Sequence, residues 1–146
     1  MSDKITIAVS KGRIFDEALP LLAKIDVIPK DDPQNSRKLI LETNKNNVQI
    51  LVIRATDVPT YVERGAAELG IAGKDVLLEY QGDGFYEPID LGIAKCKMML
   101  AGLKGVKKEI TRPRIATKYT NITQNYFSNF GKQVEIIKLY GSMELA

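Results

Sequence analysis

Short apolar runs recur along the chain, and most of them alternate with polar residues or are bounded by turn formers, which is typical of strands. Between these runs, apolar residues repeat at the three- and four-residue spacing of an amphipathic helix. The pattern predicts strands at 4–9, 38–42, 48–54, 69–72, 86–90, 94–101, 114–116 and 134–139. It predicts helices at 14–25, 57–64, 76–80 and 122–130.

Several residues mark where these helices begin, end or bend. Pro20 lies inside the first predicted helix and is expected to bend or split it, because proline removes a backbone donor. Pro59 suits the first turn of the second helix, and Gly65 suits its C-terminal cap. Asp75 is expected to cap the third helix. The strand before it, 69–72, is expected to be buried.

The alternation of strands and helices predicts an α/β fold with a mainly parallel or mixed sheet. In such sheets ligands bind beyond the carboxyl ends of the strands, where loops meet helix N-termini. Five loops follow predicted strands, so together they are expected to line one cleft. They are residues 10–13, 54–57, 72–75, 117–119 and 140–143.

The composition is that of a globular protein. With 146 residues the chain is long enough for one ordinary domain or two small lobes, and 45% hydrophobic residues supply a core. No stretch approaches the roughly 18 consecutive apolar residues of a membrane span, and the N-terminus lacks the pattern of a signal peptide. These features predict a cytoplasmic location and no membrane association.

The residue types exclude several kinds of chemistry. The sequence has no histidine and only one cysteine, Cys96, so it lacks a Ser-His or Cys-His pair, an intrachain disulfide and a typical zinc site. No metal site formed by the protein is predicted. A net charge of +3, 7% aromatic residues and no tryptophan do not fit a nucleic-acid binder. Catalysis would have to rely on carboxylates, basic residues, backbone dipoles or a cofactor.

The most informative loop is Ser10-Lys11-Gly12-Arg13, which joins a predicted strand to a predicted helix. Backbone N–H groups at a helix N-terminus attract anions, and Lys11 and Arg13 would add positive charge. The spacing alone leaves an ordinary turn with solvated cations equally open, and it matches neither a P-loop nor a dinucleotide fingerprint. Arg37 is a second cationic position, but by itself it also fits a solvent-facing side chain.

Further candidate positions follow other predicted strands. Arg54 and Asp57 suit either a ligand clamp or an internal ion pair. Gly73 and Lys74 lie in a glycine turn, which suits a close ligand approach or turn geometry alone. Asp90 suits a contact to a ribose hydroxyl or the cap of a turn. The remaining candidates supply hydroxyls and a cation that contact a ligand or cap the next helix: Thr117, Lys118 and Ser142.

Six segments, in order and with matching spacing, resemble ATP phosphoribosyltransferases over nearly the whole chain. The Gly-Lys-Asp turn at 73–75 is most similar to the short form of the family, which lacks a histidine-sensing C-terminal domain. The segments are Ser-Lys-Gly-Arg at 10–13, Arg-Ala-Thr-Asp-Val-Pro-Thr-Tyr-Val-Glu at 54–63, Glu-Leu-Gly-Ile-Ala-Gly-Lys-Asp-Val-Leu at 68–77, Ile-Asp-Leu-Gly at 89–92, Arg-Ile-Ala-Thr-Lys-Tyr at 114–119 and Tyr-Gly-Ser-Met-Glu-Leu-Ala at 140–146.

The resemblance implies a two-lobed fold like that of periplasmic binding proteins, with mixed or parallel sheets and the ligand cleft between the lobes. The first lobe would span residues 1–90, and a second, inserted lobe would span residues 91–146. The family's phosphoribosyl-binding loop, Thr-Gly-x-Thr after an acidic strand end, would follow residue 146. These residues alone are therefore expected to be catalytically inactive.

The resemblance also implies the first step of histidine biosynthesis, in which N1 of the adenine of ATP takes the phosphoribosyl group of phosphoribosyl pyrophosphate and pyrophosphate leaves. Mg²⁺ is expected on the substrate phosphates. The implied assembly is a homodimer within a hetero-oligomer that includes a regulatory subunit resembling histidyl-tRNA synthetase. A non-catalytic module that binds a small anion is the alternative. The implied catalytic residues are Arg13 and Arg37, and the implied substrate-binding residues are Lys11, Gly12, Arg54, Asp57, Gly73, Lys74, Asp90, Thr117, Lys118 and Ser142.

Overall fold

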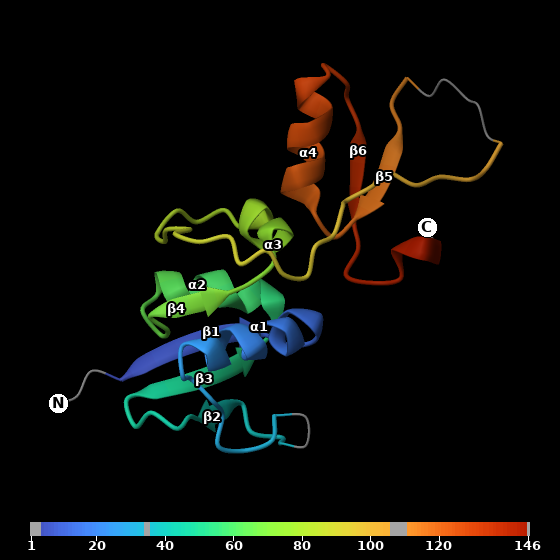
Figure 1. Cartoon of the computed structure of the whole chain (residues 1–146). Helices are drawn as coiled ribbons and strands as arrows, with labels where there is room; N and C mark the ends of the chain where they lie inside the picture. The colour runs from blue at the N-terminus through green and yellow to red at the C-terminus, as the bar shows by residue number, and fades with distance from the viewer. Residues whose placement is uncertain (1–3, 34–35, 106–110, 146) are drawn as a thin grey trace. The chain divides into compact units, whose positions relative to one another are not determined.

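The computed structural model describes residues 4–33, 36–105 and 111–145. The chain divides into two compact units, Met1–Lys95 and Cys96–Ala146 (Figure 1). Residues 34–35 and 106–110, which lie between predicted elements, are outside the described residues. The lobe boundary expected after residue 90 stays a prediction.

Unit 1 is built on a four-stranded mixed sheet in the order β2-β3-β1-β4. Strand β1 (Ile5–Ser10) pairs in parallel with β3 (Val48–Ile53) and with β4 (Leu69–Ile71), whereas β2 (Ile40–Glu42) is antiparallel to β3. Strand β1 is buried from its second residue onward because it has a neighbour on each side and a helix on each face. This strand therefore holds the unit together.

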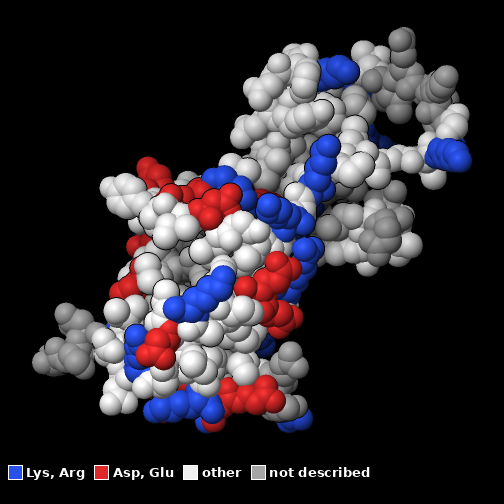
Figure 2. Space-filling view, in the orientation of Figure 1, with Lys and Arg blue, Asp and Glu red and all other residues white. Residues whose placement is uncertain are grey.

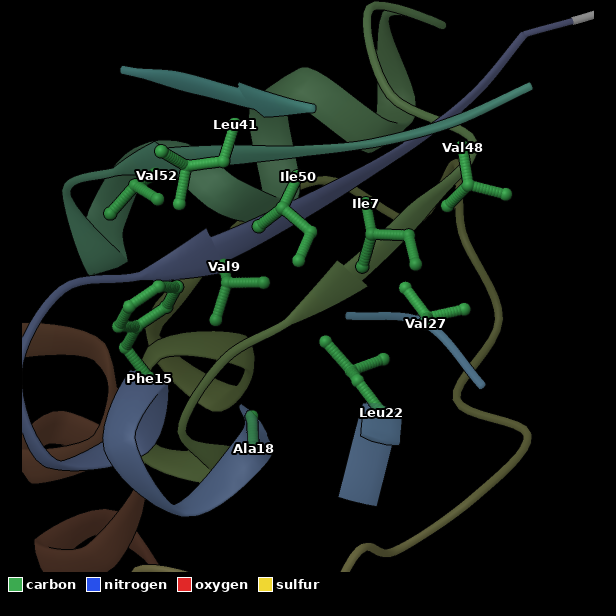
Figure 3. Packing of buried hydrophobic residues seen from close by; sticks show 10 residues of the cluster. All are labelled: Ile7, Val9, Phe15, Ala18, Leu22, Val27, Leu41, Val48, Ile50 and Val52. Atoms are coloured by element: carbon green, nitrogen blue, oxygen red, sulfur yellow. The ribbon is translucent and has the colours of Figure 1, made fainter. Parts of the chain in front are cut away.

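One face of this sheet packs against α1 (Arg13–Lys24). Figure 3 shows apolar side chains of the strands directed toward the helix, which buries Phe15, Ala18 and Leu22. Their spacing of three and four residues places them on one side of the helix. Val27, just after the helix, belongs to the same cluster, and the sheet contributes its other members: Ile7, Val9, Leu41, Val48, Ile50 and Val52. This interface is the main core of unit 1.

The opposite face of the sheet packs against α2 (Val58–Glu63), which follows the 3-10 turn Ala55–Asp57. Ala8 of β1 and Val58 of α2 are 0% and 1% exposed and belong to a second apolar cluster. The helix lies so close to β4 that a Cβ at Gly70 would come within 2.8 Å of Val58 and 2.9 Å of Val62. Position 70 therefore requires glycine, because a side chain there would collide with α2.

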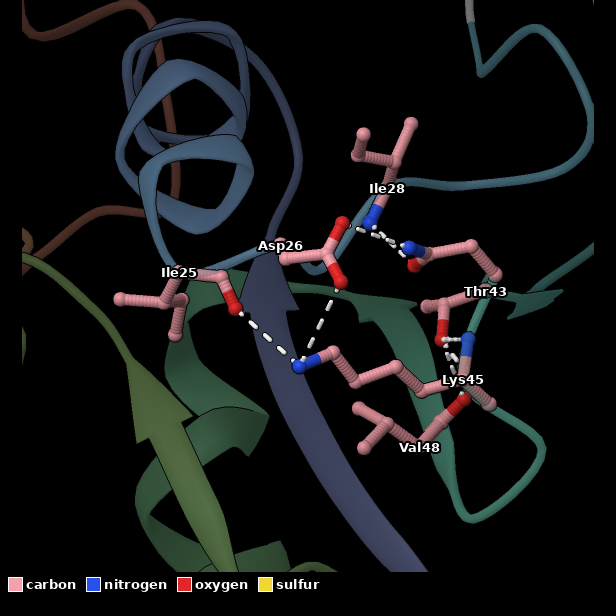
Figure 4. Close-up of polar contacts among 7 residues, drawn as sticks. Ile25, Asp26, Ile28, Thr43, Lys45 and Val48 are labelled. Atoms are coloured by element: carbon pink, nitrogen blue, oxygen red, sulfur yellow. Dashed lines mark hydrogen bonds and ion pairs between the residues drawn. The ribbon is translucent and has the colours of Figure 1, made fainter.

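A group of polar contacts ties the end of α1 to the β2–β3 turn (Figure 4). The Lys45 ammonium donates to the carbonyl of Ile25 at 3.3 Å and lies 3.8 Å from the Asp26 carboxylate. Asn44 donates to Asp26 at 3.0 Å and accepts the N–H of Ile28 at 2.9 Å. A lysine beside the last carbonyls of a helix also complements the negative end of the helix dipole.

Helix α3 (Lys74–Glu79) leads into a loop that is held by Glu63. One oxygen of the Glu63 carboxylate accepts the Tyr80 hydroxyl at 2.6 Å, and the other accepts the N–H of Gly84 at 3.1 Å. These two bonds, the Tyr80 hydroxyl first, hold the pKa of Glu63 below its ordinary value. The loop after α3 is thus fixed to the end of α2.

Unit 2 contains a two-stranded parallel sheet of β5 (Arg114–Thr117) and β6 (Glu135–Lys138), connected through α4 (Thr120–Asn129). The buried residues Thr123 and Phe127 of α4 lie one turn apart, and Val134 is buried just before β6. A short 3-10 turn, Met143–Leu145, follows. Within the described part of the chain, no helix has the length and apolar character needed to cross a bilayer.

The structure confirms the α/β class with mixed and parallel sheets, but it corrects four local predictions. Helix α1 is not split at Pro20, because Ala18 and Leu22 on either side are packed into the core, whereas a bend at Pro20 stays a prediction. No strand forms at 86–90 or 94–101, because no neighbouring strand pairs with these residues.

The other two corrections concern residues 69–75. Strand β4 is not buried: Leu69 is 51% exposed, because the strand lies at the sheet edge. Asp75 does not cap α3, since the helix already begins at Lys74 and its N-cap residue is Gly73. The carboxylate of Asp75 instead accepts the N–H of Val76 at 3.0 Å.

Two leucines, one in β2 and one just before it, test the packing of the core. Leu41 is 1% exposed and Leu39 is 56% exposed. Leu41→Ala should lower the free energy of unfolding by roughly 2–5 kcal/mol, because it leaves a cavity. Leu39→Ala should change it by no more than about 0.5 kcal/mol. Chemical denaturation measures both, and equal losses would contradict the packing described.

The Glu63 contacts predict a pH effect with a definite sign. A carboxylate whose pKa is lowered on folding stabilises the fold above the ordinary carboxyl pKa, and this contribution disappears as the pH falls through the lowered value. Tyr80→Phe should raise the pKa of Glu63 toward its ordinary value of 4.5. The stability difference between the two proteins should therefore shrink below that pH. NMR titration of the Glu63 carboxyl measures the pKa, and an unchanged value in the variant would contradict the assignment.

Candidate active site

Three of the five predicted ligand loops meet at one edge of the unit 1 sheet. Residues 10–13, 54–57 and 72–75 follow β1, β3 and β4, which are parallel neighbours. Ser10 is level with Ile53, and Val9 is level with Ile71, so the three strands end together. This edge is the position at which open α/β sheets bind ligands.

The β1–α1 turn has a backbone geometry that only glycine adopts readily. Gly12 has φ 87° and ψ −147°, and an added Cβ would meet no atom within 4 Å. The space beside its backbone is therefore open at the N-terminus of α1, where helix N–H groups create positive potential. Just before the turn, the Ser10 hydroxyl is buried and has no hydrogen-bond partner among the described residues.

A pocket of about 240 Å³ opens beside this turn. Lys11, Gly12 and Phe15 line one side, and Leu41 and Val52 supply apolar surface. The loop before β2 adds Pro33, Ser36, Arg37 and Lys38. Among the described residues, three cationic side chains and no carboxylate line the pocket, which suits a phosphorylated or otherwise anionic ligand.

The two cations from the loop before β2 differ in their surroundings. Lys38 donates to the Asp31 carboxylate at 2.7 Å, and this hydrogen bond raises the pKa of Lys38. Arg37 is exposed and makes no ion pair in the part of the chain that the structure describes. The guanidinium of Arg37 is thus available to a ligand, while Lys38 is already partly neutralised.

Arg13, the first residue of α1, is held by a bond to Glu17 on the same helix. Its Nε donates to Oε1 of Glu17 at 2.7 Å, one helical turn later. The second oxygen of Glu17 accepts the N–H of Ala94 at 2.6 Å. The Ala94 N–H, and then Arg13, hold the pKa of Glu17 below its ordinary value. The Arg13 side chain remains 66% exposed.

The structure does not support the internal ion pair that was one interpretation of the two candidates after β3. Arg54 and Asp57 form no ion pair with each other, and Arg54 has no acidic partner within the described ranges. The Asp57 N–H donates to the Arg54 carbonyl at 3.0 Å, which closes the 3-10 turn. Both side chains are exposed at the carboxyl edge of the sheet.

The candidates further along unit 1 have partners of their own. Gly73 is the N-cap residue of α3, and Lys74 is ion-paired with Glu87. The Asp90 carboxylate accepts the N–H of Gly92 at 2.8 Å and so caps a turn. A ligand at these positions would have to share or replace these contacts.

The three candidates of unit 2 follow its two parallel strands. The Thr117 hydroxyl accepts the N–H of Tyr119 at 3.0 Å, and the Lys118 ammonium lies 5.9 Å from the centre of the Tyr119 ring. Ser142 has a left-handed backbone with φ 54°. The N–H of Leu139 donates to the Thr117 carbonyl at 3.0 Å, which aligns the two strand ends at one edge.

Charge is distributed unevenly between the two units. Residues 96–146 contain nine lysines and arginines but only three acidic residues, whereas residues 1–95 contain twelve and fifteen. Figure 2 shows blue and red side chains interspersed over unit 1, while the visible face of unit 2 is white and blue. The second unit therefore provides a positive field for an anionic ligand.

Comparison with known proteins identifies the chemistry. Residues 54–146 match the family model HisG: ATP phosphoribosyltransferase. The ATP phosphoribosyltransferase of Methylococcus capsulatus is 62% identical over 142 residues, which are 97% of this chain and 67% of that protein. The chain belongs to the ATP phosphoribosyltransferase family. A relative in Pseudomonas putida, also an ATP phosphoribosyltransferase, is 58% identical over the same share of each chain.

A solved structure supports the same assignment. A chain of the ATP phosphoribosyl transferase (HisG:HisZ) complex from Thermotoga maritima is similar with a TM-score of 0.67 and 30% sequence identity. The match covers 97% of this chain and 67% of that chain. High identity to ATP phosphoribosyltransferases favours the enzyme over a non-catalytic anion-binding module of the same fold.

Two features of this site are absent from the sequence-based prediction. Lys38 lines the pocket beside Arg37, although adjacent basic residues suggest only a solvated face. Glu17 lies four residues after Arg13, a spacing at which helical side chains meet. Its contact with Arg13 was therefore predictable from the sequence. Its bond to Ala94 spans 77 residues and left no local signal.

Replacing the glycine of the β1–α1 turn tests its backbone geometry. Gly12→Ala should destabilise the protein by about 1–3 kcal/mol, because a side chain strains this conformation although space is open. Gly102→Ala is the matched control, since Gly102 also has open space but no positive φ. Chemical denaturation of both variants measures the difference. A Gly12→Ala protein as stable as the control would contradict the assigned turn.

Proposed function

We propose that this chain binds the phosphates of ATP and phosphoribosyl pyrophosphate and catalyses phosphoribosyl transfer to N1 of the adenine of ATP, the first step of histidine biosynthesis. The observation that carries the proposal is the cationic pocket beside Gly12 at the carboxyl edge of the unit 1 sheet. It joins Lys11 to Arg37, two positions that the family resemblance assigns to substrate phosphates.

The reaction explains why this set of residues suffices. The N1 lone pair forms a bond to the ribose anomeric carbon, and the bond from that carbon to the pyrophosphate oxygen breaks with its electrons. Because N1 needs no deprotonation to attack, a chain without histidine can support the step. The main task is to align two polyanions and to stabilise the leaving pyrophosphate.

Arg13 and Arg37 are the proposed catalytic residues. The guanidinium of each is exposed at or near the turn, and a guanidinium donates two parallel hydrogen bonds to phosphate oxygens. Lys11 adds charge in the same pocket, and Gly12 lets a phosphate oxygen approach the helix N-terminus. Arg54 and Asp57 would contact substrate from the next strand end.

The remaining proposed substrate contacts come from both units. Gly73 and Lys74 lie at the end of β4. The Lys74 ammonium would give up its ion pair with Glu87 to bind a phosphate. Asp90 would contact a ribose or adenine group in addition to its turn. Thr117, Lys118 and Ser142 would contribute from the positively charged unit 2.

Mg²⁺ fits this site as a partner of the substrates. Within the described residues, no group of three or more acidic, histidine or cysteine side chains converges on one point. The polyphosphates of the two substrates would therefore supply most of its ligands, and the ion would neutralise part of their charge. The protein's own cations then orient the remaining phosphate oxygens.

The proposed assembly is a homodimer within a complex with a HisZ-type regulatory subunit. Support comes from the similar Thermotoga maritima chain, whose structure is that of a HisG:HisZ complex. A cytoplasmic location follows from the same biosynthetic role. The regulatory partner would control the activity of the catalytic chain.

Removing either proposed catalytic arginine tests the site. In the full-length enzyme, Arg13→Ala and Arg37→Ala should each lower kcat at least about tenfold, or about 1.4 kcal/mol, because each removes charge from the leaving pyrophosphate. Arg64→Ala is the control, since Arg64 ends α2 away from the pocket. Pyrophosphate release measures all three rates. Unchanged kinetics in both the Arg13 and the Arg37 variant would rule out this assignment.

A further inference from the structure

Arg13 is a long, exposed side chain, yet its guanidinium is fixed at one atom. The bond to Glu17 uses Nε, with a distance of 2.7 Å to Oε1. The two terminal nitrogens of Arg13 have no hydrogen-bond or ion-pair partner within the described ranges. These two nitrogens are the pair that forms parallel hydrogen bonds to a phosphate. The contact therefore restricts the guanidinium without occupying its ligand-binding edge.

Glu17 is itself held in place by a contact distant in sequence. Its second oxygen accepts the N–H of Ala94 at 2.6 Å. Ala94 has a left-handed backbone with φ 47°, and the neighbouring Ile93 packs against the core between α1 and the sheet. The carboxylate thus lies between a side chain on α1 and a backbone anchored to the same unit.

We propose that Glu17 is a positioning residue for Arg13, which orients the guanidinium for the leaving pyrophosphate by bridging Arg13 Nε and the Ala94 N–H. This inference rests on the proposed role of Arg13. An ordinary surface pair of the same spacing would add little, because exposed ion pairs are weak. The bond to the Ala94 backbone distinguishes Glu17 from such a pair, because it fixes the carboxylate before Arg13 binds a ligand. Arg13 therefore loses less conformational freedom when the ligand binds.

The bridge needs two acceptor oxygens, so Glu17→Gln breaks it with little change in size. The glutamine amide has one acceptor oxygen and an NH₂ group that only donates. With the side chain in its wild-type position, either Arg13 Nε or the Ala94 N–H would therefore face the NH₂ group, which cannot accept a hydrogen bond. In the full-length enzyme, Glu17→Gln should lower kcat about threefold to tenfold, because a misplaced charge stabilises the leaving group poorly. Glu42→Gln is the control, since Glu42 is bonded to neither Arg13 nor Ala94 and is ion-paired with the exposed Lys30 at 3.6 Å.

A double-mutant cycle separates positioning from a general structural effect. In the Arg13→Ala background, Glu17→Gln should change kcat by less than about twofold, because the group that it orients is gone. Equal losses in both backgrounds would overturn the proposal and assign Glu17 a role independent of Arg13. If Arg13→Ala alone leaves kcat unchanged, the proposed function of Arg13 fails first, and the positioning role fails with it.

A spectroscopic measurement reports on the contact directly. The Nε–H proton of Arg13 should exchange slowly with solvent in the wild-type protein, and Glu17→Gln should accelerate that exchange. Titration with inorganic pyrophosphate should then show weaker binding to Glu17→Gln than to Glu42→Gln. Rapid exchange in the wild-type protein, or equal pyrophosphate affinity in the two variants, would overturn the proposal.

Discussion

The parallel pairing of β1 with both β3 and β4 is the interaction on which the rest of unit 1 depends. It places β1 at the centre of the sheet, with α1 packed on one face and α2 on the other. The same pairing brings three strand ends level, because parallel strands of one register end at one edge. The residues that fill the core therefore also determine where a ligand can bind. A shift of one residue in β1 would exchange Val9 for Ala8 in the main core and displace the turn at Gly12.

The sequence predicts those elements whose signals are local. Residues 4–9 and 48–54 show strand-like apolar runs, and the spacing of Phe15, Ala18 and Leu22 is helical, so β1, β3 and α1 were all predictable. The loops after β1, β3 and β4 follow from the same reasoning, and they account for the edge that carries Lys11 and Gly12. Family resemblance, rather than pattern, supplied the choice of Arg37.

The errors arise where long-range contacts decide the outcome. Residues 94–101 alternate like a strand, but no neighbouring strand pairs with them, and Met99 is 77% exposed. Pro20 costs α1 one backbone hydrogen bond, yet burial of the helix face outweighs that cost. The contact between Glu17 and Ala94 joins positions far apart in sequence, and neither residue type indicates it. Local pattern therefore predicts the scaffold better than the contacts that orient its functional side chains.

The uneven charge of the two units has a consequence for how the protein meets its ligands. A net charge of +3 describes an almost neutral molecule, but the two units carry charges of opposite sign. A polyanion approaching through solution experiences the nearer unit more strongly, because dissolved ions screen fields beyond about 8 Å at physiological ionic strength. At physiological ionic strength attraction to unit 2 and repulsion from unit 1 are therefore more local, and where salt is scarce they offset each other only in part, to a net charge of +3. Capture of a polyphosphate would therefore depend on the direction of its approach more than the overall charge suggests.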